Sequence, residues 1–289
     1  MTVGLEPNPE ATRPEAIGAG GRRKGSSYGT TSLRVGAASI WISVIVLLPL
    51  AAILWQSAGG GWGAFVDAVT YPSAVASFKV TLTISLGVAI VNTFFGLLVA
   101  WVLTRDDFVG KRLVDAIIDL PFALPTIVAS LVMLALYGNN SPLGIHVQHT
   151  RWGVGVALLF VTLPFVVRSV QPVLLELDRE VEEAAASLGA NNWTIFRAVI
   201  LPALLPSLLS GAGLAFSRAV GEFGSVVLIG GGIPGETQVS SQWIATLLEY
   251  NDRTSAAAIS IVLLVVSFLI LFVLRFVGGR AAKREQLAP

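Results

Sequence analysis

Arg218 and Glu222 are the residues whose types and spacing first suggest chemistry, because two opposite charges stand four positions apart within a long apolar stretch. On a helix, side chains at positions i and i+4 share one face and can pair, which lowers the cost of burying charge in an apolar medium. Ionisable groups in such surroundings can line a path for ions, although structural ion pairs occur there as well. Both interpretations stay open, and Phe223 is a further gate candidate.

Thr81, Ser85 and Asn92 form a second polar set, at i, i+4 and i+11 on one helical face, with Lys79 near one end. These side chains could line a polar route. The alternative, which we favour, is that they hydrogen-bond between helices while Lys79 extends towards water.

Small residues repeat at every fourth position next to the charged pair, which permits a second helix to approach closely. This small-residue stripe consists of Gly213, Ser217, Gly221 and Ser225.

The sequence predicts no metal site, no cofactor and no catalytic residue in this chain. His146 and His149 have no acidic neighbour, and cysteine is absent. The glycine-rich segment 18–27 lacks the Gly-Lys-Ser/Thr ending of a phosphate loop, and no strand precedes it. We therefore expect that the chain itself does not bind ATP.

The composition indicates that membrane helices position these residues, since 54% of the residues are hydrophobic and only 13% are charged. Apolar runs of about 20 residues are long enough to cross a bilayer as helices. We predict an all-α, polytopic membrane protein with six spans, at about Ala37–Gln56, Ser77–Leu103, Val114–Tyr137, Gly153–Leu175, Ala203–Gly230 and Ala256–Val277.

Lysine and arginine gather before the first span, between the second and third, and after the sixth, which predicts that both termini are cytoplasmic. Residues 1–34 should form a disordered tail without a cleaved signal peptide. Residues 35–74 would hold the first helix and an external connection, residues 75–277 a core domain, and residues 278–289 a C-terminal tail. Within the core, we expect Asp119 to cap the third helix before Pro121, and Arg168 to extend towards the cytoplasm.

The connection at 178–202 differs from the others. Acidic residues lead into an alanine run that favours a short helix, and Gly189 supplies its end. Trp193 and Phe196, at i and i+3, would share a face of a second short helix before Leu201-Pro202 opens the next span. A helix–glycine–helix elbow results, in which small and aromatic side chains suit contact with another protein.

These residues resemble the EAA loop of the membrane subunits of type I ABC importers, which reads Glu-Ala-Ala, three residues, Gly, nine residues, Ile, one residue, Leu-Pro. Here Glu183-Ala184-Ala185, Gly189 and Leu201-Pro202 match, and Val199 replaces the usual Ile. The resemblance implies a permease fold in which this loop docks on an ATP-hydrolysing subunit, rather than an ordinary amphipathic connection. The implied docking residues are Glu183, Ala184, Ala185, Gly189, Ala190, Trp193 and Phe196.

Three further segments, Pro121–Thr126, Leu163–Pro172 and Ala219–Gly224, resemble the sulfate and molybdate permeases, and the six spans resemble the T-type sulfate/thiosulfate subunit. The resemblance implies four kinds of partner: a homologous second permease that would meet the small-residue stripe, two ATP-binding subunits that hold ATP and Mg, an external sulfate-binding protein, and membrane lipid. It also implies the plasma membrane of a bacterium.

For a sulfate pathway, Glu222 poses a difficulty, because a carboxylate repels a dianion unless it is paired or protonated. We expect Arg218 to neutralise it, so that the route holds no deep anion trap. Molybdate or tungstate transport is one alternative. A secondary anion carrier driven by an ion gradient and a non-transporting assembly protein are two others, and neither would need a docking elbow.

Overall fold

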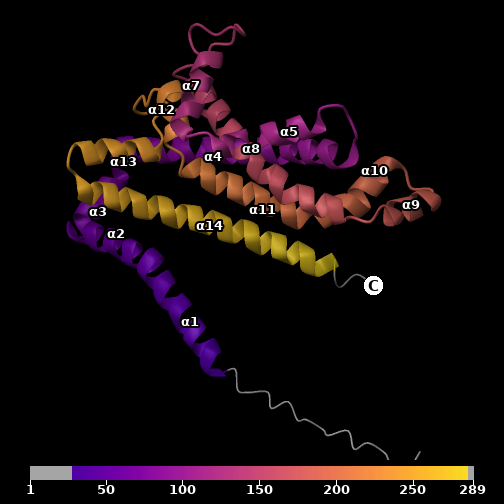
Figure 1. The fold of residues 1–289 in the computed structure, drawn as a ribbon. Coiled ribbons are helices and arrows are strands. Elements are labelled where there is room, and N and C mark those ends of the chain that lie inside the picture. Colours follow the sequence, from indigo (N-terminus) through magenta and orange to yellow (C-terminus); the bar gives the residue numbers. More distant parts are fainter. Residues whose placement is uncertain (1–27, 286–289) are drawn as a thin grey trace, which may run out of the picture. The chain divides into compact units, whose positions relative to one another are not determined.

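The computed structural model describes residues 28–285, and every regular element in this range is helical (Figure 1). The all-α prediction is therefore confirmed. The chain divides into two compact units, one up to Leu50 and one from Ala51 onward. The first contains α1 (Tyr28–Ile42) and a π-helical turn at Ser43–Leu47, and α2 covers Leu48–Ala58.

The second unit contains the helices that position the candidate sites. They are α3 (Gly61–Thr70), α4 (Pro72–Arg105), α5 (Lys111–Ile118), α6 (Leu120–Ala123), α7 (Thr126–Tyr137), α8 (Arg151–Glu176), α9 (Arg179–Ser187), α10 (Asn192–Ile195), α11 (Leu201–Val220), α12 (Gly224–Gly230), α13 (Ser240–Glu249) and α14 (Arg253–Glu285).

Three long helices, α4, α8 and α11, pack against one another, and α14 packs on α11 (Figure 1). A buried apolar cluster that includes Val166, Leu174 and Leu204 joins α8 to α11. The same cluster continues to Ile195 and Ile200, which lie in the predicted elbow. The elbow is thus attached to the helix bundle by apolar packing.

Helix boundaries at both ends of the chain differ from the prediction. α1 begins at Tyr28, inside the predicted tail, and residues 1–27 lie outside the described range. At the other end α14 continues to Glu285, through most of the predicted C-terminal tail, and residues 286–289 lie outside the described range.

Within residues 28–285, five helical stretches are long and apolar enough to cross a membrane, which is one fewer than predicted. The exception is the third predicted span, whose only uniformly apolar helix, α7, has 12 residues. A helix of that length covers about 18 Å, less than a hydrocarbon core of about 30 Å. Pro121 and Pro125 divide the rest of this segment into the short helices α5 and α6, because proline cannot continue the helical hydrogen-bond ladder.

The predicted roles of Asp119 and Arg168 in this region are wrong. The Asp119 side chain forms no capping hydrogen bond. Instead its carboxylate binds the guanidinium of Arg168, with 2.7 Å between Nη2 and Oδ2. Arg168 therefore holds a neighbouring segment of the chain rather than extending towards water.

The fifth predicted span is also interrupted, because α11 ends at Val220 and α12 begins only at Gly224. The short helix α12 packs beside α7, and the two lie together at one end of the bundle (Figure 1). Ser130 Oγ of α7 accepts hydrogen bonds from the N–H groups of Leu228 and Ile229, at 3.1 and 3.4 Å. The short helices α7 and α12 thus replace the C-terminal parts of the third and fifth predicted spans.

Candidate functional site

The first half of the elbow is a short helix, α9, with defined ends. The Asp178 carboxylate accepts the N–H of Glu180 at 2.9 Å, and Glu180 and Glu182 place negative charge in the first turn. At the C-terminus, Gly189 donates to Ala186 O and Ala190 donates to Ala185 O. This hydrogen-bond pair is a Schellman motif, which requires a left-handed residue, and Gly189 has φ +87°. The predicted stop at Gly189 is confirmed.

The second half of the elbow is not a separate helix. The Asn191 side chain accepts the N–H of Thr194 and starts α10. The chain then passes through a π-helical turn at Phe196–Ile200 directly into α11. Pro202 has no N–H to offer the carbonyl four residues earlier, and the turn before it widens so that Leu201 N–H binds Phe196 O. Leu201-Pro202 therefore lies within a continuous helical stretch, Asn192–Val220.

Side-chain contacts hold the elbow against the C-terminal end of α4. Glu182 of α9 forms an ion pair with Arg105, the last residue of α4, and both side chains are largely buried. The Arg105 guanidinium lies 5.6 Å from the centre of the Trp101 ring. Trp101 in turn meets the edge of Phe196, with 5.9 Å between ring centres. Movement of the elbow must therefore displace α4 or break these contacts.

The exposed surface of the elbow differs from the predicted docking set. Glu183, Ala184, Gly189 and Trp193 are exposed, and the Trp193 ring stacks on Phe196. Three other members of the predicted set pack against the chain's own core and lie beneath the exposed surface of the elbow: Ala185, Ala190 and Phe196. Sequence reasoning missed Leu188, which is 90% exposed at the bend. A large apolar residue next to the predicted stop was the available signal.

A cavity of about 420 Å³ lies where α11 ends and α12 begins. We call it the gate pocket. Its lining consists of Pro125, Thr126, Ile127, Arg218, Gly221, Glu222, Phe223 and Gly224. Two of the sequence segments noted above, one before α7 and one before α12, therefore meet in one place.

Arg218 and Glu222 form the predicted ion pair inside the gate pocket, with 2.6 Å between Nη1 and Oε2. They do not lie on one continuous helix, since Glu222 follows the end of α11. The Glu222 side chain is 1% exposed and also accepts the N–H of Ser225 at 2.8 Å, whereas the Arg218 side chain is 36% exposed. The carboxylate is thus buried behind a guanidinium that faces the pocket.

Comparisons with known proteins agree with the elbow and the bundle. Residues 92–283 match a sequence family described as the binding-protein-dependent transport system inner membrane component. The chain belongs to this family. It is therefore a multi-pass membrane protein and a permease subunit of an ABC transporter, and it has no hydrolytic role of its own.

Among curated relatives of this permease, the sulfate transport system permease protein CysT of Escherichia coli K12 is 44% identical over 88% of this chain and 94% of its own length. CysT of Synechococcus elongatus is 47% identical over 81% of this chain and 87% of its own. A chain in the crystal structure of a bacterial alginate ABC transporter has a TM-score of 0.72 at 16% identity. It covers 88% of this permease and 95% of that chain, which shows a shared fold.

The polar set on α4 of the permease lies between helices rather than along an open route. Ser240 N–H donates to Thr81 Oγ1 at 2.7 Å, and Asn92 donates to Leu159 O and to Thr162 Oγ1. Ser85 is fully buried. Hydrogen bonding and burial between helices account for the positions of these three residues, as the favoured alternative predicts, and their role in the pathway stays a prediction.

The small-residue stripe also serves contacts within this permease. A Cβ atom at Gly213 would lie 3.2 Å from Leu271 of α14, so the close approach there is intramolecular. Ser225 is fully buried. Only the middle of the stripe, Ser217 and Gly221, borders open space, in a second cavity of about 350 Å³ between α11, α13 and α14.

The two histidines lie in the connection between α7 and α8. His146 Nδ1 lies 2.9 Å from Gly138 O, and the His149 ring lies against Gly231. Among the described residues, no cluster of three or more His, Cys, Asp or Glu side chains could hold a metal ion.

Proposed function

We propose that this permease forms half of the translocation pathway of an ATP-driven importer for sulfate, and for thiosulfate as well. The observation that carries this proposal is its identity of 44% to the Escherichia coli sulfate transport permease over 88% of the chain. The gate pocket supports it, since a guanidinium facing a cavity suits an oxyanion.

Arg218 is the residue that would meet the anion in the gate pocket. Its guanidinium has Glu222 as a partner, and its partial exposure leaves further N–H groups facing the cavity. Glu222 sits behind it and offsets its charge. The pair therefore attracts an anion weakly, which favours passage over retention.

A second, homologous permease would complete the pathway. Phe223 at the mouth of the gate pocket is 42% exposed, and Ser217 and Gly221 border open space beside it. Both features fit a surface that another permease covers. Because Gly213 packs on α14 and Ser225 is fully buried, the interface would be limited to this central part of the stripe.

The elbow is the proposed docking element for an ATP-binding partner. Its exposed residues Glu183, Ala184, Leu188 and Trp193 would enter a groove of that subunit, which binds ATP and Mg. Exposed apolar side chains on a polar loop are typical of interface anchors. An external sulfate-binding protein would deliver the anion at the opposite end.

The basic flanks support a cytoplasmic location for both termini of this permease, which would span the plasma membrane of a bacterium. Lysine and arginine are enriched at Lys111 and Arg112 between the second and third apolar segments, on the same side as the elbow.

Uptake of labelled sulfate by the complete complex in lipid vesicles tests this function. ATP and the binding protein should both be required, and excess thiosulfate should compete. Uptake that an ion gradient drives without ATP would contradict the importer, and complete inhibition by molybdate would overturn the choice of sulfate.

A further inference from the structure

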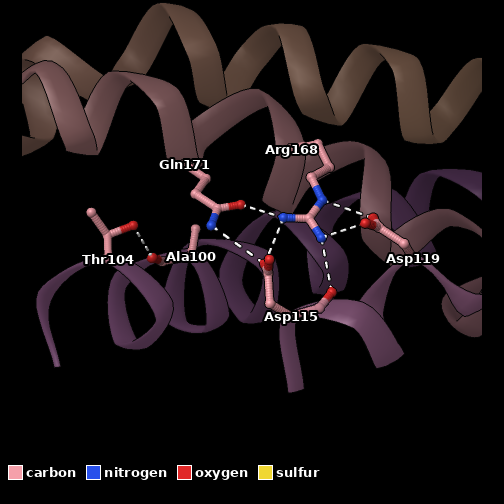
Figure 2. Close-up of polar contacts among 6 residues, drawn as sticks. All are labelled: Ala100, Thr104, Asp115, Asp119, Arg168 and Gln171. Carbon is pink, nitrogen blue, oxygen red and sulfur yellow. Dashed lines mark hydrogen bonds and ion pairs between the residues drawn. The ribbon is translucent and has the colours of Figure 1, made fainter. Parts of the chain in front are cut away.

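Arg168, in the middle of α8, uses every N–H group of its guanidinium within one small cluster (Figure 2). Nε and Nη2 each donate to the Asp119 carboxylate at 2.7 Å. Nη1 donates to Asp115 Oδ1 at 2.7 Å and to Gln171 Oε1 at 2.5 Å. Nη2 also donates to the backbone carbonyl of Asp115 at 2.9 Å. The five N–H donors of an arginine are thus all paired.

Stability alone does not account for this cluster. The side chains of Arg168, Asp115 and Asp119 are 29%, 43% and 49% exposed in this chain. An ion pair adds little net free energy of folding when water surrounds it, and when it is buried the cost of removing its charges from water offsets their attraction. A bidentate pair with additional hydrogen bonds instead defines the relative orientation of two segments, which a lysine cannot reproduce. The arrangement is therefore suited to positioning.

The position of Arg168 along α8 indicates how the cluster can transmit movement. Pro164 and Pro172 lie on either side of it in the same helix. Each proline removes a helical hydrogen bond and lets the helix bend. The segment between them can therefore turn as a unit, and Arg168 connects that unit to α5 and α6.

One end of this unit leads to the elbow. Only Leu177 and Asp178 separate α8 from α9. Leu174, at 2% exposure, packs in the same buried cluster as Ile195 and Ile200 of the elbow. A displacement of the elbow therefore reaches the lower part of α8 through both chain connection and packing.

The other end leads to the gate pocket. Asp119 directly precedes α6, and Phe122 of α6 meets the edge of Phe165 of α8, with 5.0 Å between ring centres. Two residues after α6, Pro125 and then Thr126 line the gate pocket. The segment that Arg168 holds therefore leads directly into the residues that line the gate pocket.

We propose that Arg168 is a positioning residue that binds α6 to the part of α8 between Pro164 and Pro172, so that movement of the elbow is transmitted to the gate pocket. This role rests on the proposed importer function. Without the cluster, α8 could bend at its prolines while α6 stays in place, and ATP hydrolysis would proceed without opening the pocket.

Arg168→Lys tests the proposal in the complete complex, because it keeps the charge and removes the five-donor geometry. We expect normal assembly and ATP hydrolysis within about twofold of the wild type, but about tenfold less sulfate transported per ATP hydrolysed, the range of a typical coupling energy. Arg112→Lys is the matched control, since Arg112 lies on α5 and is exposed. That variant should keep the wild-type ratio.

The outcomes separate this proposal from the function on which it rests. An unchanged ratio in Arg168→Lys, with a coupled wild type, would overturn the positioning role alone. Uptake and hydrolysis that fall in parallel would also overturn it, since that result indicates a structural role. If the wild-type complex shows no ATP-dependent uptake, the importer function itself fails.

A distance measurement gives a readout independent of transport. The sequence contains no cysteine, so a pair of cysteines introduced at the exposed Leu120 of α6 and the half-buried Ser169, between the two prolines of α8, provides the only two spin-labelling sites in this chain. During the nucleotide cycle, the wild type should keep one narrow distance distribution. In Arg168→Lys we expect a second or broadened distribution, and an unchanged distribution would contradict the proposal.

Discussion

At the scale of single residues, burial decides which partner of an ion pair can act on a ligand. Glu222 is buried and bound by both Arg218 and a backbone N–H, so it cannot turn into the gate pocket without losing these bonds. Arg218 is partly exposed and keeps donors available. Spacing suggested the pair, but the division of roles follows from its surroundings.

Glu222→Gln should slow sulfate uptake, because an unbalanced Arg218 would hold the anion more tightly. We expect roughly tenfold slower maximal uptake with a lower half-saturation concentration, a change of about 1.4 kcal/mol in barrier height. Initial uptake rates in vesicles, measured over a range of sulfate concentrations at several pH values, give the maximal rate and the half-saturation concentration. Glu236→Gln, in an exposed loop, serves as control, and unchanged uptake of Glu222→Gln at every pH would contradict a pathway role.

At the scale of elements, glycines decide how the helices end and approach each other. Gly189 permits the left-handed turn that closes α9, whereas Gly224 permits α12 to lie against the start of α7. The first requirement concerns the backbone conformation and the second concerns space. Substitutions can distinguish them.

Gly189→Ala should loosen the end of α9 by backbone strain alone, since no atom lies within 4 Å of the added Cβ. A left-handed alanine costs about 1 kcal/mol. Hydrogen exchange of the amides in 178–196 should therefore be about fivefold faster. Gly189→Asn should show a smaller effect, because asparagine tolerates this conformation. Equal exchange in the alanine variant and the wild type would refute the assignment.

Gly224→Ala should destabilise the contact of α12 with α7. Its Cβ would lie 2.2 Å from Thr126 Oγ1 and 3.0 Å from the backbone nitrogen of Ile127. Such overpacking costs about 1–3 kcal/mol, visible as a lower thermal midpoint of the purified permease and as lost uptake. Gly155→Ala is the matched control, since the only atom near its added Cβ is Ile84 Cγ2 at 3.9 Å. Identical midpoints for the two variants would rule out the clash.

At the scale of the whole molecule, the elbow and the gate pocket are parts of one continuous helix bundle. The elbow lies at the C-terminal ends of α4 and α8, and the gate pocket lies between the end of α11 and the start of α12. α8 connects the two regions through its proline-flanked middle. The exposed elbow should therefore control association with the ATP-binding subunit without altering the fold of the bundle.

Trp193→Ala should weaken binding of the ATP-binding subunit, since this ring is 67% exposed and stands at the centre of the elbow surface. Loss of an interface anchor costs about 2 kcal/mol, or roughly 30-fold in affinity. Titration of the detergent-solubilised permease with that subunit measures it. Trp152→Ala, at the opposite end of α8 and 79% exposed, should leave the affinity unchanged, and equal losses in both variants would exclude a specific anchor.

The sequence by itself determined the membrane class, the elbow and the charged pair. These features depend on local chemistry: long apolar runs, capping residues around Gly189, and an i, i+4 spacing. The resemblance to sulfate and molybdate permeases identified the segments before α7 and α12 without showing that they meet.

Only the tertiary structure decided what the polar side chains bind. Asp119 and Arg168, far apart in the sequence, became partners because α5 and α6 pack beside α8. Thr81 and Asn92 proved to join helices, and Gly213 proved to face α14 of the same chain. Hydrophobic periodicity indicates that a face is buried, but not against which neighbour, since many helices offer an equally apolar surface. At the break between α11 and α12, the backbone carbonyl of Glu222 likewise accepts a hydrogen bond from Ser241 Oγ of α13, a partner that only the assembled bundle supplies.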